Sequence, residues 1–126
     1  MENSHIIIPA YVPEWTDKYF HQSAFDAPWN FPSQKVIKSL SKFKKDKKIK
    51  LFRGINKFNE KSLEISSWTY NRENAKNYIQ EGGKIIKREF SPSKILLDTT
   101  LLNKEQKILM GYDYKVDDKE VLVFNK

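Results

Sequence analysis

The sequence predicts a single domain of the α+β class. Its 126 residues are enough for one modest core but not for two domains. Apolar patterns indicate loops and a helix over residues 1–48, and then a sheet core of short strands with interspersed helices over residues 49–126. These elements do not alternate as parallel βαβ units do, which favours the α+β class over the α/β class.

The composition excludes several classes of protein. Hydrophobic residues make up 39% of the chain and aromatic residues 13%, which is too rich for a disordered chain. The chain has no cysteine and two histidines, so we expect no disulfide, no thiolate nucleophile and no metal site. The apolar runs, such as residues 6–8, are too short to cross a bilayer, and the N-terminus does not resemble a signal peptide. We therefore expect a cytoplasmic protein that does not bind membranes.

Residues 1–32 combine many aromatic residues with four of the five prolines of the chain. Because proline limits regular structure, we expect loops here, with one short helix around Asp17–Ser23. The aromatic side chains are expected to form a flap that packs on the core. A second interpretation is that they line part of a ligand cleft.

A helix is predicted from Ser33, as its N-cap, to about Lys45. Apolar residues repeat on one face of this helix at Val36, Ile37, Leu40 and Phe43. The run Lys42–Lys50 that overlaps its end contains six lysines and one aspartate. Such a run can bind phosphates or an acidic protein, although a solvated helix end and loop is the simpler interpretation.

The remaining elements are shorter. Strands are predicted over Ile49–Ile55, Leu63–Tyr70, Lys84–Phe90, Ile95–Leu97 and Glu120–Phe124. Helices are predicted over Arg72–Gln80, capped by Asn71 and ended by Gly82 and Gly83, and from Asn103 to Met110, ended by Gly111. Ser91–Ser93 is predicted to be a turn.

Three predicted strands carry polar residues that stand out from their apolar surroundings. Arg53 shares a strand face with Leu51 and Ile55, and a guanidinium on such a face suits a phosphate or carboxylate. Ser67 and Thr69 share a face of the second strand. The pair Asp118 and Glu120 opens the last strand. Each position taken alone is explained by simple exposure to solvent, so the argument depends on their combination.

In this order, the three motifs resemble the Arg–Ser–Glu branch of the ADP-ribosyltransferase superfamily. The matching segments lie within Lys50–Phe124 and read LFRG, ISSWTYNRENAKNYI and DDKEVLVF. The resemblance implies a split β-sandwich, with an N-terminal helical and loop segment, that holds NAD between two small sheets. It also implies that the enzyme transfers ADP-ribose from NAD to a macromolecule.

The resemblance further implies roles for individual residues. Arg53 would hold the pyrophosphate of NAD, Ser67 would order the nicotinamide-ribose pocket, and the Glu120 carboxylate would accept a hydrogen bond from the ribose 2′-hydroxyl. Glu120, Arg53 and Ser67 are thus the expected catalytic residues. The expected cofactor contacts are Arg53, Gly54, Ser67, Thr69 and Tyr78.

The acceptor-binding residues implied by the resemblance are Asp118, Tyr112 and Tyr114. Asp118 stands where the family has Glu or Gln, which leaves modification of arginine open. The two tyrosines suit stacking on an acceptor, or equally packing within their own loop. The resemblance to small phage or bacterial effectors favours a protein acceptor, and the positive charge also allows nucleic acid.

Two other functions are consistent with the sequence. The net charge of +7 suits a basic module without catalytic activity that binds nucleic acid or an acidic protein. The second alternative is a relative of the transferases that binds NAD but has lost turnover.

Overall fold

The computed structural model describes residues 7–21, 31–55, 65–76, 79, 83–112 and 119–124. Its fold is mixed α and β, with a five-stranded antiparallel sheet in the order β3–β1–β2–β5–β4. The strands are β1 (Ile49–Ile55), β2 (Ile65–Thr69), β3 (Lys84–Phe90), β4 (Ile95–Asp98) and β5 (Glu120–Phe124). The α-helices are α1 (Tyr11–His21), α2 (Gln34–Leu40), α3 (Arg72–Ala75) and α4 (Lys104–Leu109), and the 3-10 turns are η3 (Pro92–Lys94) and η4 (Thr99–Leu101).

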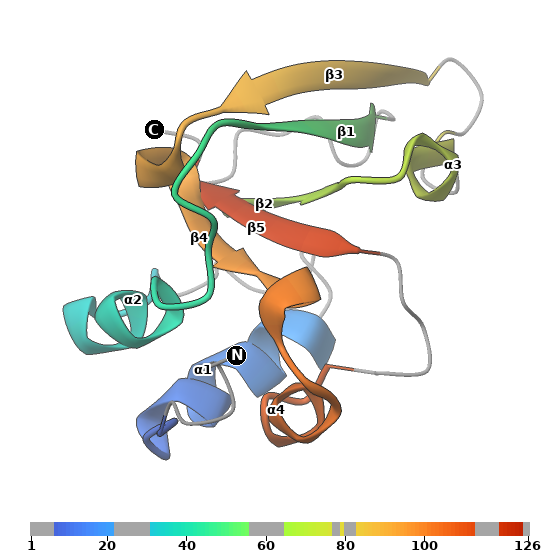
Figure 1. Ribbon diagram of the computed structural model, residues 1–126. Helices are drawn as coiled ribbons and strands as arrows, with labels where there is room; N and C mark the ends of the chain where they lie inside the picture. The colour runs from blue at the N-terminus through green and yellow to red at the C-terminus, as the bar shows by residue number, and fades with distance from the viewer. Residues whose placement is uncertain are drawn as a thin grey trace.

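The helices lie mainly on one side of the sheet. In Figure 1, α1, α2 and α4 gather beneath β4 and β5, whereas β1 and β3 lie at the opposite side of the fold. A first core cluster joins these helices to the sheet through Val12, Leu40, Leu97, Met110 and Leu122. Burial of these side chains, all fully buried, holds the helices in place.

A second core cluster lies on the other face of the sheet. It contains Leu51, Trp68, Phe90 and Val121, and the rings of Trp68 and Phe90 meet edge to face at 4.8 Å. Because side chains alternate along a strand, β2 and β5 contribute to both clusters. On β5, for example, Leu122 belongs to the first cluster and Val121 to the second.

The sheet is unevenly paired. Strand β1 pairs with β3 along its whole length, from Ile49 opposite Phe90 to Ile55 opposite Lys84. Within the described ranges, β1 and β2 share a single register pair, Phe52 with Thr69. The two parts of the sheet, β3–β1 and β2–β5–β4, are thus joined by few ladder contacts among the described residues, and Figure 1 shows the strands following one another in this order.

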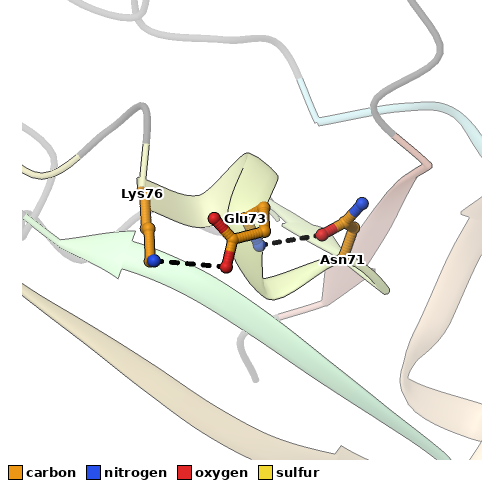
Figure 2. Close-up of polar contacts among 3 residues, drawn as sticks. All are labelled: Asn71, Glu73 and Lys76. Atoms are coloured by element: carbon orange, nitrogen blue, oxygen red, sulfur yellow. Dashed lines mark hydrogen bonds and ion pairs between the residues drawn. The ribbon is translucent and has the colours of Figure 1, made fainter.

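Most predicted elements are confirmed. The bounds of β1, β3 and β5 are those expected, and Ser33, Asn71 and Asn103 cap α2, α3 and α4 as predicted. Figure 2 shows the Asn71 side chain accepting from the Glu73 amide (2.8 Å), and the exposed ion pair between Lys76 and Glu73 (3.1 Å). Helix α3 ends at Ala75, with Lys76 as its C-cap, and so it is shorter than the predicted Arg72–Gln80. Gln80 and Gly82 lie outside the described residues.

Two further helix boundaries were predicted wrongly. Helix α1 begins at Tyr11, not near Asp17, because Pro13 lies in the first turn, where a helix does not need the missing N–H. Helix α2 ends at Leu40, not near Lys45. The chain turns there because Phe43 is drawn into the core, where its carbonyl accepts from the Asp98 amide (2.8 Å).

Candidate functional site

The sheet order places three of the predicted site residues on neighbouring strands. Arg53 lies on β1, Ser67 on the adjacent β2, and Glu120 at the start of β5, which is the next strand. Thr69 is directly opposite Glu120 in the antiparallel register. The predicted polar motifs, which are far apart in the sequence, are therefore brought together at one region of the sheet.

Arg53 connects β1 to β2 where their pairing is sparse. Its Nη1 donates a hydrogen bond of 2.7 Å to the backbone carbonyl of Ser67. By alternation along β1, Arg53 shares the face of Leu51, which belongs to the second core cluster. Its neighbour Gly54 is buried. The guanidinium thus fixes the backbone beside the candidate hydroxyl, and its fork carries further N–H donors.

Tyr19 of α1 lies at the centre of these groups. Its phenol shares a hydrogen bond of 2.9 Å with the Ser67 hydroxyl. Burial raises the pKa of Tyr19 well above its ordinary value near 10, the Ser67 hydrogen bond lowers it, the Glu120 carboxylate raises it and the Arg53 guanidinium lowers it. Both charged groups therefore influence the pKa of the phenol, which stays protonated at neutral pH.

The aromatic surroundings of Tyr19 hold it in place. Its ring stacks on Trp15, one helical turn earlier, with a centroid distance of 5.3 Å, and meets the ring of Phe20 edge to face at 5.7 Å. Phe20 in turn packs on Tyr112 at 5.0 Å. Helix α1 is thus fixed by aromatic contacts on the side that delivers the phenol to the site.

The two hydroxyls of the second motif have different roles in the structure. The Ser67 hydroxyl faces Tyr19, whereas the Thr69 hydroxyl accepts from the Asn71 amide (3.0 Å) and closes the turn that leads into α3. Thr69 is buried. Ser67 is therefore the hydroxyl presented to the candidate site, and Thr69 supports the turn beside it.

The backbone before and at Glu120 is held from two sides. The Thr99 hydroxyl donates to the Glu120 carbonyl (2.6 Å), and the Tyr70 amide donates to the Lys119 carbonyl (3.3 Å). Lys119 itself has φ of 52°, in the left-handed region that non-glycine residues rarely adopt. These constraints set the direction in which the Glu120 side chain leaves the strand.

A buried carboxylate lies behind this strand end. Asp98 is fully buried, and it accepts from the Tyr70 phenol (2.5 Å) and from both the amide (3.0 Å) and the hydroxyl (2.6 Å) of Thr100. Burial and the Asp98 partner together raise the pKa of Tyr70. The Lys45 ammonium lies over the Tyr70 ring, 4.5 Å from its centroid. This cluster fixes the ends of β2 and β4, next to Glu120.

The remaining predicted residues divide into two groups. Tyr112 is buried, and its ring packs on Phe20. This position fits the packing role considered for Tyr112 and not direct stacking on an acceptor. Tyr78, Tyr114 and Asp118 lie outside the described residues.

Sequence reasoning did not identify Tyr19 or Thr99 as site residues. Tyr19 was placed in an aromatic flap, with the lining of a cleft as a second interpretation. The buried residues Val12 and Thr16 precede it at helical spacing, and that pattern would have predicted the helix and its inward face. For Thr99, which follows an apolar strand, no pattern in the sequence marks its contact with Glu120.

The described residues were also searched for a metal site and a membrane-spanning helix, and the chain was compared with known proteins. Among the described residues, no group of three or more acidic or histidine side chains gathers where it could hold a metal ion. No helix in the described part of the chain has the length and apolar character needed to cross a membrane. Comparison of the chain with protein-family models, curated proteins and solved structures finds no match.

Proposed function

We propose that the protein is a mono-ADP-ribosyltransferase, which transfers ADP-ribose from NAD to a macromolecular acceptor. The observation that carries the proposal is that Arg53, Ser67 and Glu120 lie on three neighbouring strands, with Ser67 hydrogen-bonded to the Tyr19 phenol through its hydroxyl and to Arg53 through its carbonyl. The sparse pairing between β1 and β2 supports the further proposal that the sheet is the split β-sandwich of this superfamily. In such a fold, NAD is bound where the two halves separate.

The chemistry requires one carboxylate and several fixed donors. Cleavage of the bond between nicotinamide and ribose releases nicotinamide with the bonding electron pair and leaves an oxocarbenium-like sugar. The Glu120 carboxylate, hydrogen-bonded to the ribose 2′-hydroxyl, stabilises this positive charge. The acceptor nucleophile then bonds to the same sugar carbon and loses its proton to solvent. Arg53 holds the pyrophosphate by paired N–H donors.

Tyr19 takes part in this arrangement as a fixed hydroxyl. Its phenol is neutral at neutral pH, as that of an ordinary tyrosine is, and the raised pKa extends this neutral form to higher pH. A ribose held by Ser67 and Glu120 contacts this phenol. We infer that Tyr19 orders the Ser67 hydroxyl and excludes water from the side of the site covered by α1.

The acceptor in this proposal is a protein side chain. Asp118 and Tyr114 are the proposed acceptor contacts, because they belong to the segment that leads to Glu120. Tyr112 is not included, because it is buried. The enzyme is proposed to act in the cytoplasm of the cell that produces it or of a host cell.

The test is incubation with NAD labelled in its adenylate part, together with cell extract as acceptor. Wild-type protein is expected to release nicotinamide and to transfer label to protein. Glu120→Ala is expected to abolish transfer while retaining most NAD affinity, because its carboxylate acts in the transition state. Arg53→Ala is expected to weaken NAD binding as well.

Matched controls separate catalysis from charge and folding. Glu105→Ala and Arg72→Ala remove the same charges at exposed positions of α4 and α3, and both are expected to retain wild-type transfer. Transfer by Glu120→Ala at the wild-type rate would show that the assignment is wrong. Binding of NAD without release of nicotinamide would instead identify a relative that has lost turnover.

A further inference from the structure

The positive charge of the chain is concentrated in one part of the fold. Residues 42–50 and 87–94, called here the basic unit, contain nine basic and two acidic residues, a net charge of +7. The whole chain also has a net charge of +7, so all other residues together are neutral, with 14 basic and 14 acidic residues. The basic residues of the unit are Lys42, Lys44, Lys45, Lys47, Lys48, Lys50, Lys87, Arg88 and Lys94.

The fold brings the two segments of the basic unit together. Ile49 is paired with Phe90 and Lys50 with Glu89 in the β1–β3 ladder. The Lys44 ammonium donates to the Pro92 carbonyl (3.0 Å), which joins the turn before β1 to the turn after β3. In Figure 1, the segment that leads from α2 into β1 runs beside the end of β3.

Most of these cations are held at the surface. Lys44 and Lys45 are partly buried, and the other seven are exposed. Only Asp46 and Glu89 offset them within the unit. Cations at this density repel one another, and a bound polyanion removes that repulsion and releases counterions. The charge distribution therefore fits a partner that carries many negative charges in a row.

The sheet face beside the basic unit carries an aromatic ring, that of Phe52, which suits contact with a base. Lys50 and Phe52 alternate with Leu51, so they lie on the face of β1 that is turned away from the second core cluster. Lys87 of β3 lies opposite Phe52 in the register, and both lysines are exposed, whereas Phe52 is half-buried. An aromatic ring beside two lysines offers stacking to a base and charge to the flanking phosphates. Glu89, which lies opposite Lys50 on the same face, offsets part of this charge.

We propose that the basic unit binds single-stranded nucleic acid, with its phosphates on the exposed lysines and a base against Phe52. An acidic protein would use the same cations, whereas a nucleic acid in addition stacks a base on the ring. The surface adjoins the candidate site, because Lys45 lies over Tyr70, whose amide contacts the residue before Glu120. The binding needs no NAD, so it is measured separately from the proposed transferase activity, although Phe52 is paired with Thr69 beside the candidate site.

The experiment measures binding of a fluorescent 20-nucleotide oligothymidylate by anisotropy, without NAD, over a series of salt concentrations. The triple variant Lys47→Gln, Lys48→Gln and Lys50→Gln is compared with the charge-matched control Lys18→Gln, Lys35→Gln and Lys104→Gln, whose exposed lysines lie on or beside other helices. We expect the first variant to bind about 100-fold more weakly at 0.1 M salt, with a salt slope shallower by about 2, because each phosphate contact on a single strand contributes roughly 0.7 to the slope.

A second variant and two competitors decide the class of partner. Phe52→Leu keeps an apolar side chain and is expected to weaken oligothymidylate binding at least fivefold while leaving the salt slope unchanged. Polyglutamate of the same length and a 20-base-pair duplex are expected to compete poorly. The proposal is overturned if the control triple variant loses as much affinity, if Phe52→Leu binds as wild type, or if either competitor binds as tightly as the oligonucleotide. Thermal unfolding of each variant verifies that it is folded.

Discussion

Replacing Tyr19 by phenylalanine isolates the hydroxyl that joins α1 to the candidate site. The substitution keeps the ring and its stacking on Trp15, and it removes the 2.9 Å hydrogen bond to Ser67. Because this bond is made inside the fold, its loss leaves the serine without that partner and without full access to water. Such a change lowers the free energy of unfolding by about 1–3 kcal/mol.

The assay is urea-induced unfolding, with Tyr11→Phe as the matched control. Tyr11 lies on the same helix and is 38% exposed, so the loss of its hydroxyl is expected to change the free energy of unfolding by no more than about 0.5 kcal/mol. The slope with urea is expected to be the same for all three proteins, because the surface exposed on unfolding is unchanged.

The pH dependence gives an independent measure of the same hydroxyl. The pKa of Tyr19 is raised in the folded protein, so between the unfolded value near 10 and the folded value the folded state binds the extra proton. The stabilisation by Tyr19 is therefore fully present below pH 10 and declines as the pH rises further, by up to about 1.4 kcal/mol per pH unit. The difference between wild type and Tyr19→Phe should follow this course.

Two results would refute the reasoning. A destabilisation no greater than that of Tyr11→Phe would show that the Ser67 hydrogen bond contributes little. A difference between wild type and Tyr19→Phe that stays constant up to pH 11.5 would show that the phenol is not shielded from solvent.

Three further substitutions test the packing around the site. Gly111→Ala should lower the free energy of unfolding by at least about 2 kcal/mol, because Gly111 has φ of 80° and a Cβ there would meet Asp17, whose Cα would lie 3.2 Å away; Asp17→Ala in the same chain should recover only part of this loss in urea titrations. Tyr70→Phe should cost about 2 kcal/mol in the same measurement, because the buried Asp98 carboxylate loses a donor, and a cost under 0.5 kcal/mol would contradict this role. Thr16→Val should raise the free energy of unfolding by about 1 kcal/mol, because the buried Thr16 hydroxyl has no hydrogen-bond partner among the described residues. A lower unfolding midpoint in urea would contradict this.

Local signals in the sequence predicted the elements on which the site is built. Short apolar runs predicted β1 and β3 with the bounds that the structure has. Asn103 was predicted to be an N-cap because its side chain can accept from a free amide of the first helical turn. In the structure it accepts from the Gln106 amide (2.8 Å), and the Gln106 side chain accepts from the Asn103 amide (2.8 Å).

The parts that were not predicted depend on contacts between distant residues. The order of β1, β2 and β5 in the sheet follows from packing of both faces, and no local pattern specifies it. The contact between Tyr19 and Ser67 spans 48 residues, and it exists only because α1 packs on the sheet. Helix α2 was predicted too long because its lysines have good helix propensity, whereas the burial of Phe43 ends the helix at Leu40.

The long chain separation between Tyr19 and Ser67 has a kinetic consequence. Contacts at such separations form late in folding, because the entropy of closing the intervening loop is lost before the contact stabilises the chain. A partly folded molecule in which β1 and β3 are already paired would still lack the phenol beside the serine. A spectroscopic probe at Tyr19 would therefore report completion of the native state, and its burial should coincide with the slowest phase of refolding.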